Sequence, residues 1–278
     1  MPNTRFLKAL TLFIITLIVS FSVNAQVKIM TWNLLNVGKS KSQENIEYIA
    51  KTIKQTDIIA IQEVVTNPTG AQTIAKIHEE LNRSSGAKWD YAISDPTVSS
   101  PYRSERYAYL WRTSKVKLKG KPFLEPTYQE EIEREPYMAT FIYKGKEITI
   151  SSLHALPTKH QPEKEIKYLK FFPEHYPEHN LIFLGDFNLS ESHSVFNPLK
   201  KQGYLPSFST QKTSLRQKCL KGDCLASEYD NIFYHPDKNE LISAKPIYFF
   251  EDFEDFEEIS IARKVSDHIP LLITLNIL

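Results

Sequence analysis

The apolar residues in the first part of the chain recur with two different spacings. Short continuous runs at 27–32 and 58–61 are typical of buried strands. Between them, apolar residues from 46 to 53 recur at helical spacing, and Ser40 with Gln43 resembles a capping box at the start of that helix. This part of the chain therefore predicts a strand, a helix and a second strand.

The alternation continues to the end of the chain. Further strands are predicted at 89–93, 107–111, 116–119, 139–143, 148–153, 181–184, 229–234, 247–250 and 271–275. Helices are predicted over 71–81 and from about 162 to 172. Helices early and in the middle, with short strands between them, indicate an α/β fold in which helices cover a layered pair of sheets.

Composition indicates a single domain. The chain has 278 residues, of which 41% are hydrophobic, and this is enough for one large core. It has only 8 glycines and no long Ser/Gly or Pro tract, so nothing in it resembles a flexible linker. We expect one domain over residues 26–278.

Residues 1–25 have the pattern of a secretory signal peptide. Arg5 and Lys8 give a positive start, residues 10–21 are almost wholly apolar, and small residues at 23–25 offer a cleavage site. A membrane anchor is the alternative, but the apolar run is short for a membrane span. We expect a secreted or periplasmic protein that has no stable membrane association after cleavage.

The net charge limits how strongly the protein as a whole can attract a polyanion such as nucleic acid. Cleavage after residue 25 removes two of the 34 basic side chains and none of the 33 acidic ones, which leaves a net charge of −1. Nothing global then attracts nucleic acid, so any binding of a polyanion must come from local contacts.

The chain has two cysteines, Cys219 and Cys224, and the predicted compartment is oxidising. We expect the two cysteines to form a small disulfide that closes a loop. Two thiols without nearby histidines do not fill a zinc shell, and the spacing is not that of a redox Cys-x-x-Cys motif.

Oxygen-bearing side chains follow three of the predicted strands. Asn33 ends the first strand and Glu63 ends the second, and neighbouring parallel strands would place both at one edge of a sheet. Asp186 and Asn188 follow the strand at 181–184, and in an extended turn residues two apart point the same way. Carboxylate and amide oxygens suit Mg²⁺, Mn²⁺ or Ca²⁺, so the sequence predicts a site for a divalent cation.

Two histidines have the character of an acid/base pair. His154 closes the strand at 148–153, and His268 lies in a turn before the last strand. Two imidazoles suit a hydrolysis in which one group activates water and another protonates the leaving alkoxide. Each would need an orienting carboxylate, for which Glu105 and Asp230 are candidates because each lies beside a strand-like run.

Arg134 is the candidate phosphate ligand. It lies in a Glu-Arg-Glu-Pro segment, and its guanidinium could fork onto a phosphate. A surface salt bridge with its acidic neighbours is the alternative, and the sequence leaves both open.

The order of these residues resembles the endonuclease/exonuclease/phosphatase superfamily, and within it the secreted deoxyribonuclease I branch. The matching segments are Thr31-Trp32-Asn33, Ile61-Gln62-Glu63-Val64, Ser104-Glu105-Arg106-Tyr107, Arg134-Glu135-Pro136, Leu153-His154, Gly185-Asp186-Phe187-Asn188, Tyr229-Asp230 and Ser266-Asp267-His268-Ile269-Pro270. They run in family order and cover essentially the whole chain after the signal segment.

The resemblance implies a four-layer α/β/β/α sandwich with a metal site. Asn33, Glu63 and Asp267 would help to hold a divalent ion, with Mg²⁺ as the expected ion and Mn²⁺ or Ca²⁺ as alternatives. Asp186 would contact both the metal and the scissile phosphate, together with Asn188.

The resemblance also implies the acid/base roles. His154, oriented by Glu105, is expected to be the acid, and His268, oriented by Asp230, the base, although the sequence leaves the order of the two histidines open. Arg134 would bind phosphate. Water would attack phosphorus directly, and the products would carry 5′-phosphate and 3′-hydroxyl ends.

Three positions depart from the deoxyribonuclease I pattern. Basic residues that enter the minor groove in that branch correspond here to Leu35 and Val65, and a tyrosine that packs against the substrate sugar corresponds to Arg103, next to Tyr102. The chemical positions are filled while the groove-reading contacts differ, so the choice between double-stranded DNA, single-stranded DNA and RNA stays open.

We therefore expect a secreted, monomeric, metal-dependent endonuclease that cleaves DNA with little sequence specificity. A phosphatase or phospholipase of the same superfamily, acting on inositol phosphates or sphingomyelin, is one alternative. The chain lacks a long apolar hairpin for bilayer insertion, which counts against the lipid substrate. A catalytically inactive binding module on the same fold is the other alternative.

Overall fold

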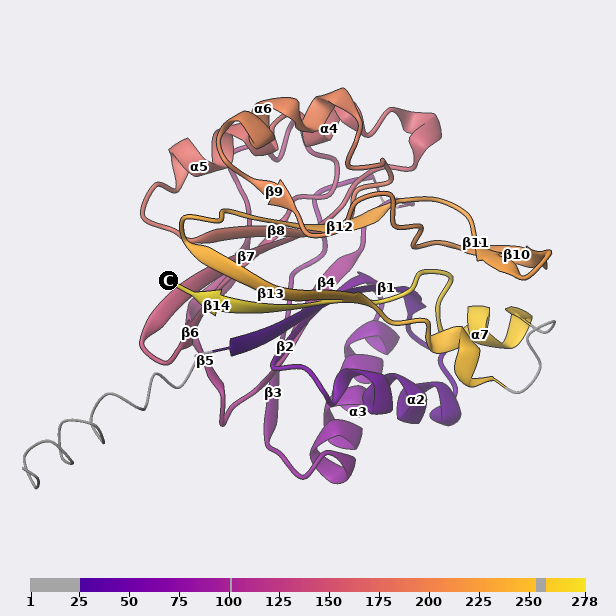
Figure 1. The fold of residues 1–278 in the computed structure, drawn as a ribbon. Helices are drawn as coiled ribbons and strands as arrows, with labels where there is room; N and C mark the ends of the chain where they lie inside the picture. Colours follow the sequence, from indigo (N-terminus) through magenta and orange to yellow (C-terminus); the bar gives the residue numbers. More distant parts are fainter. Residues whose placement is uncertain (1–25, 101, 254–258) are drawn as a thin grey trace, which may run out of the picture.

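Two six-stranded sheets pack face to face, and helices cover the outer side of each (Figure 1). The computed structural model describes residues 26–100, 102–253 and 259–278, so the expected signal peptide at 1–25 lies outside the described residues. The expected four-layer α/β/β/α sandwich is confirmed. Among the described residues, no helix has the length and apolar character needed to cross a membrane.

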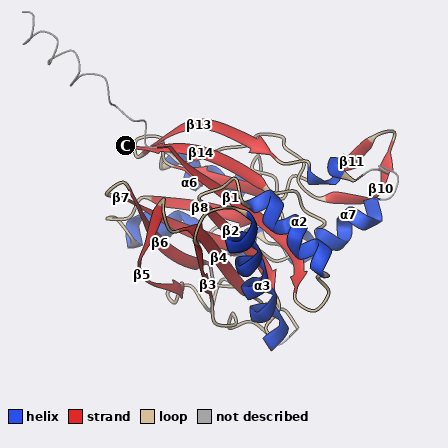
Figure 2. Cartoon of the chain, turned by 90° about the horizontal axis from the view of Figure 1, so that it is seen from below, coloured by secondary structure: helices blue, strands red, loops and turns tan. Residues whose placement is uncertain are grey.

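The first sheet has the strand order β13-β14-β1-β2-β4-β3. Its strands are β1 (Gln26–Val37), β2 (Ile58–Val64), β3 (Trp89–Ile93), β4 (Arg106–Arg112), β13 (Asn239–Pro246) and β14 (Leu271–Ile277). The helices on its outer face are α2 (Gln43–Ile53), α3 (Pro68–Ser84) and α7 (Ile259–Val265) (Figure 2). The pair β1 and β2 is parallel, as predicted, so the ends that carry Asn33 and Glu63 lie at the same edge of the sheet.

The second sheet has the strand order β5-β6-β7-β8-β12-β9. Its strands are β5 (Val116–Leu124), β6 (Tyr137–Tyr143), β7 (Lys146–His154), β8 (Leu181–Asp186), β9 (Leu205–Pro206) and β12 (Asp230–Tyr234). The helices on its outer face are α4 (Glu163–Ile166), α5 (Phe172–His175) and α6 (Asn197–Lys201), with the 3₁₀ turns η1 (Thr158–His160), η2 (Leu169–Phe171) and η3 (Ser194–Phe196).

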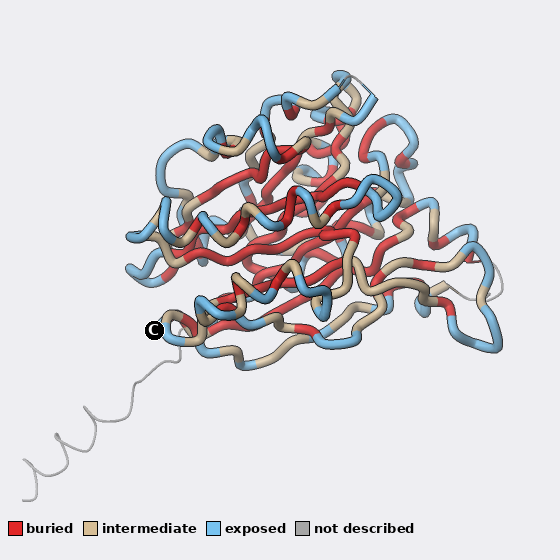
Figure 3. Tube along the Cα trace, turned by 90° about the horizontal axis from the view of Figure 1, so that it is seen from above, coloured by how far each residue is buried: buried red, intermediate tan, exposed pale blue. Residues whose placement is uncertain are grey.

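Three apolar clusters fill the spaces between the four layers. One lies between the first sheet and its helices, one between the two sheets, and one between the second sheet and its helices. Viewed from above, the buried residues follow the central strands, while exposure is concentrated in the connections (Figure 3). Burial of this apolar area, at roughly 25 cal/mol per Å², is the dominant force that holds the sheets together.

Two predicted elements are absent from the structure in the form expected. The helix expected over 162–172 is broken into α4, η2 and α5. The segment 247–250 is not a strand: β13 ends at Pro246, and Phe249 enters the 3₁₀ turn η4 (Phe249–Asp252), where its ring lies 5.3 Å from that of Trp32. The apolar character of the segment reflects this core packing and not pairing in a sheet.

The first helix begins two residues later than predicted. Ser42 is its N-cap and forms a capping box with Asn45, so the pairing of Ser40 with Gln43 was wrong. The expected disulfide is present between Cys219 and Cys224, and it joins the two strands of the projecting hairpin β10 (Leu215–Leu220) and β11 (Asp223–Leu225).

Gly185 allows β7 and β8 to approach each other beside the candidate site. Its φ is +132°, and a Cβ placed there would lie 1.9 Å from the carbonyl oxygen of Leu153. We expect Gly185→Ala to lower the free energy of unfolding by about 3 kcal/mol or more, because backbone strain and overpacking act together.

Gly86 is the matched control for Gly185, since its φ is +68° but nothing lies within 4 Å of a Cβ built there. Gly86→Ala should cost only about 1–2 kcal/mol, the strain of a left-handed residue. Urea unfolding of the two variants measures the difference. Equal losses would show that the contact with Leu153 is not the constraint.

Candidate active site

Strand register places the central residues of the site in one row across the second sheet. In the parallel pair of β7 and β8, His154 lies opposite Asp186, and in the antiparallel pair of β8 and β12, Asp186 lies opposite Asp230. Residues paired across strands point to the same face of a sheet. The three side chains therefore meet at the ends of their strands although they are far apart in sequence.

The first sheet supplies the other half of the site. Asn33 and Glu63 come from the parallel neighbours β1 and β2, as predicted, and the amide Nδ2 of Asn33 donates to Glu63 Oε1 at 2.9 Å. The same Nδ2 lies 3.1 Å from Asp186 Oδ2, so Asn33 joins the two sheets. His268 enters from the turn before β14, and its carbonyl oxygen accepts the indole N–H of Trp32.

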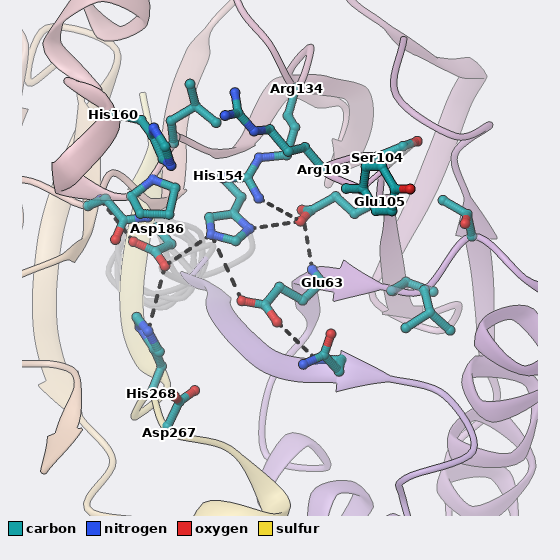
Figure 4. A pocket seen from close by; sticks show the side chains of 18 of the residues that line it. Glu63, Arg103, Ser104, Glu105, Arg134, His154, His160, Asp186, Asp267 and His268 are labelled. Atoms are coloured by element: carbon teal, nitrogen blue, oxygen red, sulfur yellow. Dashed lines mark hydrogen bonds and ion pairs between the residues drawn. The ribbon is translucent and has the colours of Figure 1, made fainter. Parts of the chain in front are cut away.

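Asp186 lies at the centre of the site between the two imidazoles (Figure 4). It is 1% exposed, and its Oδ2 is 3.5 Å from His154 Nε2 and 3.6 Å from His268 Nε2. Its Oδ1 accepts the backbone N–H of Asn188. Both imidazoles thus present the same ring nitrogen to one carboxylate.

Each imidazole is held from behind by a second carboxylate, as predicted. Nδ1 of His154 lies 2.9 Å from Glu105 Oε2, and Nδ1 of His268 lies 2.7 Å from Asp230 Oδ2. When Nδ1 carries the proton it donates to the carboxylate, and Nε2 is left to exchange a proton with a ligand in the cleft.

The carboxylates shift the pKa values of both imidazoles upward. Burial alone would lower the pKa of His268, but the charges of Asp230 and Asp186 outweigh it and hold this pKa well above its usual range. Burial likewise opposes protonation of His154, whose pKa is raised mainly by Glu105. Burial would raise the pKa of Asp186, but the two imidazoles keep it below its ordinary value.

Arg134 is buried and not part of a surface salt bridge. It is 7% exposed, its Nη1 donates to Glu105 Oε2 at 3.0 Å, and its Nη2 donates to the carbonyl of Ala155. It also lines the pocket, so it both fixes Glu105 and presents a cation to the cleft. Phosphate binding by Arg134 stays a prediction.

The segment from Asp186 to Asn188 turns back and is not extended, contrary to the sequence prediction. Asn188 has a φ of +51°, and its Nδ2 donates to the carbonyl of Ala155 at 2.9 Å. The backbone N–H of Asn188 donates to Asp186 Oδ1 at 2.9 Å. Its side chain still lines the pocket, but by a different geometry.

Asp267 lines the same pocket, but its side chain pairs with Arg263 and not with Asn33 or Glu63. Its side chain is 25% exposed and pairs with Arg263 at 3.3 Å. In Figure 4 its carboxylate lies beyond His268, on the side away from His154. Its role as a metal ligand stays a prediction.

The donor set fits a divalent cation. Glu63 Oε1 shares the amide of Asn33 with the buried Asp186, which places two carboxylates around one neutral group. Asp186, Asp230 and His268 also hold one donor atom each within 4.8 Å of one another. Asp230 is occupied by His268 Nδ1, so we favour the side of Asp186 that faces Glu63.

No sequence pattern predicted the supporting role of four further residues. Tyr107 accepts the N–H of His154, Thr213 accepts the N–H of Asp230, and Ser266 accepts the N–H of His268. Lys41 is buried and donates to the carbonyls of Lys264 and Val265 at the end of α7. Burial lowers the pKa of Lys41 to about 8 against the opposing charges of nearby carboxylates.

Comparison with known proteins defines the family. A model of the Endonuclease/Exonuclease/phosphatase family matches residues 30–268, and the chain belongs to that family of hydrolases. Within it, the chain falls in the deoxyribonuclease I-like branch.

Two relatives illustrate this placement, and one solved structure shares the fold. The chain is 26% identical to a deoxyribonuclease of Thioalkalivibrio sp. over 95% of this chain and 75% of that protein. It is 25% identical to deoxyribonuclease-1 of Bos taurus over 90% of this chain and 92% of that protein. The fold is shared with a mannosyl-6-phosphatase of Bacteroides thetaiotaomicron, with a TM-score of 0.62, 17% identity and coverage of 90% and 99% of the two chains.

The raised pKa of His268 can be measured directly. We expect NMR titration of its ring in the presence of EDTA to give a pKa above 6.5, and we expect Asp230→Asn to lower it, because the charge of Asp230 is the largest influence that raises it. The titration of His154 serves as the internal control, since its own partner is Glu105. An unchanged pKa of His268 in the variant would contradict this electrostatic account.

Proposed function

We propose that the chain is a secreted or periplasmic nuclease that uses a divalent cation to hydrolyse phosphodiester bonds of DNA with little sequence specificity. One observation carries the proposal: two imidazoles, each oriented by its own carboxylate, present Nε2 to the buried Asp186 from two sides. The names of the relatives, which are deoxyribonucleases, support DNA as the substrate.

The two imidazoles divide the proton transfers. His268, in its neutral form and with Nδ1 held by Asp230, takes a proton from the attacking water at Nε2, and the protonated His154, with Nδ1 held by Glu105, gives one to the leaving 3′ oxygen. The bond between phosphorus and the 3′ oxygen breaks as the bond to water forms. The products carry 5′-phosphate and 3′-hydroxyl ends.

Glu63 and Asp186, supported by Asn33, are the residues that would hold the cation, with Asp267 as a further ligand. A Mg²⁺ ion, or Mn²⁺ or Ca²⁺, would offset negative charge on the pentacovalent transition state. Arg134 and Asn188, which line the same cleft, would bind the phosphate oxygens.

A phosphatase is the second candidate, because the shared fold includes a mannosyl-6-phosphatase. The cleft is open and has a volume of about 550 Å³, which accommodates either a small phosphate ester or part of a nucleic acid strand.

The disulfide between Cys219 and Cys224 supports an oxidising location, in agreement with the signal peptide predicted at 1–25.

We expect His154→Ala and His268→Ala each to reduce DNA cleavage by about 10²–10⁴-fold, the usual range for loss of a general acid or base. The exposed His175, on α5, provides the matched control, and His175→Ala should retain full activity. Circular dichroism would show whether each variant keeps its fold. Native spectra with nearly full activity would refute the acid/base assignment.

A substrate panel tests both the metal and the substrate class. We expect supercoiled plasmid to be nicked, EDTA to abolish the reaction, and added Mg²⁺ or Mn²⁺ to restore it, because Asp186 and Glu63 need a counter-charge before a phosphate can approach. Single-stranded DNA, RNA, phospholipid vesicles and mannose 6-phosphate complete the panel. Intact plasmid together with hydrolysis of the lipid or the sugar phosphate would favour the second candidate.

A further inference from the structure

The cleft contains four basic side chains besides the paired histidines: Arg103, Arg134, Lys159 and His160. Arg134 is committed to Glu105, and Arg103 lies 3.7 Å from the carboxylate of Glu133. Across residues 26–100, 102–253 and 259–278, no acidic group forms an ion pair with Lys159 or His160. These two exposed side chains are therefore the basic groups of the cleft that remain available to an anion.

The turn that carries Lys159 and His160 is hydrogen-bonded to the loop that contains Asn188. Lys159 and His160 belong to η1, which begins four residues after His154. The hydroxyl of Thr158 donates to the carbonyl oxygen of Asn188 at 2.9 Å. In Figure 4, His160 lies on the Asp186 side of the pocket, across from Ser104. The position of η1 relative to the scissile-phosphate residues is thus set by a hydrogen bond and a short connection.

The end of β2 and the loop that follows it provide a different kind of surface. They contribute Val64, Val65 and Thr66 to the same cleft, and none of these residues carries a charge. Leu35 is only partly exposed and is not one of the residues that line the pocket. Like Val65, it occupies a position where the deoxyribonuclease I pattern has a basic residue that enters the minor groove of DNA. A polyanion in the cleft would therefore find its free cationic contacts on η1 and not on the β2 loop.

We propose that Lys159, with His160 beside it, binds a backbone phosphate next to the scissile phosphate, so that the cleft holds one nucleic acid strand by its phosphates. This rests on the proposed nuclease function. A lysine ammonium binds a phosphate as a point charge and needs no fixed fork geometry, which suits an exposed turn. Because the chain expected after cleavage has a net charge of −1, attraction of a polyanion must come from local contacts of this kind.

The test uses a short single-stranded DNA oligonucleotide with Mg²⁺, and it measures how kcat/KM falls as NaCl rises from 25 to 200 mM. Each neutralised phosphate of a single strand contributes about 0.7 to the slope of the logarithmic plot, so Lys159→Gln should make the slope shallower by about that amount. Lys159→Arg should keep the wild-type slope. Lys117→Gln removes the same charge from an exposed site on β5 outside the cleft, and it should also keep that slope.

A second substrate separates the subsite from the chemistry. Bis(4-nitrophenyl) phosphate is a diester without a flanking phosphate, so Lys159→Gln should reduce kcat/KM about tenfold more on the oligonucleotide than on this diester at 25 mM NaCl, with the loss mainly in KM. Losses of equal size on both substrates would show that Lys159 supports the reaction itself. They would contradict the proposal that it binds a flanking phosphate.

The remaining outcomes distinguish the subsite from the nuclease itself. If wild-type protein cleaves the oligonucleotide and Lys159→Gln has the wild-type salt slope, the subsite is wrong and the nuclease function stands. If wild-type protein hydrolyses the small diester but no oligonucleotide, the proposed nuclease function fails and the subsite fails with it. Circular dichroism of Lys159→Gln confirms that the exposed substitution leaves the fold intact.

Discussion

A nearly inaccessible carboxylate held between two imidazoles is the interaction on which the rest of the site depends. Removing an ion such as Asp186 from water costs several kcal/mol even after relaxation of the surroundings. The structure offsets this cost with the imidazoles of His154 and His268 and with hydrogen bonds from Asn33 and Asn188. Each compensating group must stay in place, so the charge of Asp186 organises its neighbours as much as they stabilise it.

This balance couples the site to the packing of the whole sandwich. One sheet provides the row of His154, Asp186 and Asp230, and the other provides Asn33 and, from the turn before β14, His268. Neither sheet alone can neutralise the buried carboxylate. The apolar cluster between the sheets therefore has a chemical role: it brings two sets of polar strand ends within hydrogen-bonding distance.

The sequence predicted the sandwich and the partners of both histidines, because strand runs and an ordered set of motifs are local signals. It could not predict contacts that depend on remote backbone. Lys41 reaches carbonyls more than 200 residues away, and Thr213 supports Asp230 from a loop with no distinctive motif. The turn at Asn188 was missed because a positive φ in a non-glycine residue is imposed by its surroundings.

The arrangement of charge explains why the free basic groups are at the rim of the cleft. Two like charges 4 Å apart repel by about 4 kcal/mol at an effective dielectric constant of 20, so a phosphate near Asp186 and Glu63 needs a cation. The guanidinium of Arg134 cannot supply this alone, since Glu105 already draws on it. In the proposed nuclease, a cation at the centre and Lys159 at the edge would act on different phosphates, and this division would separate catalysis from binding of the strand.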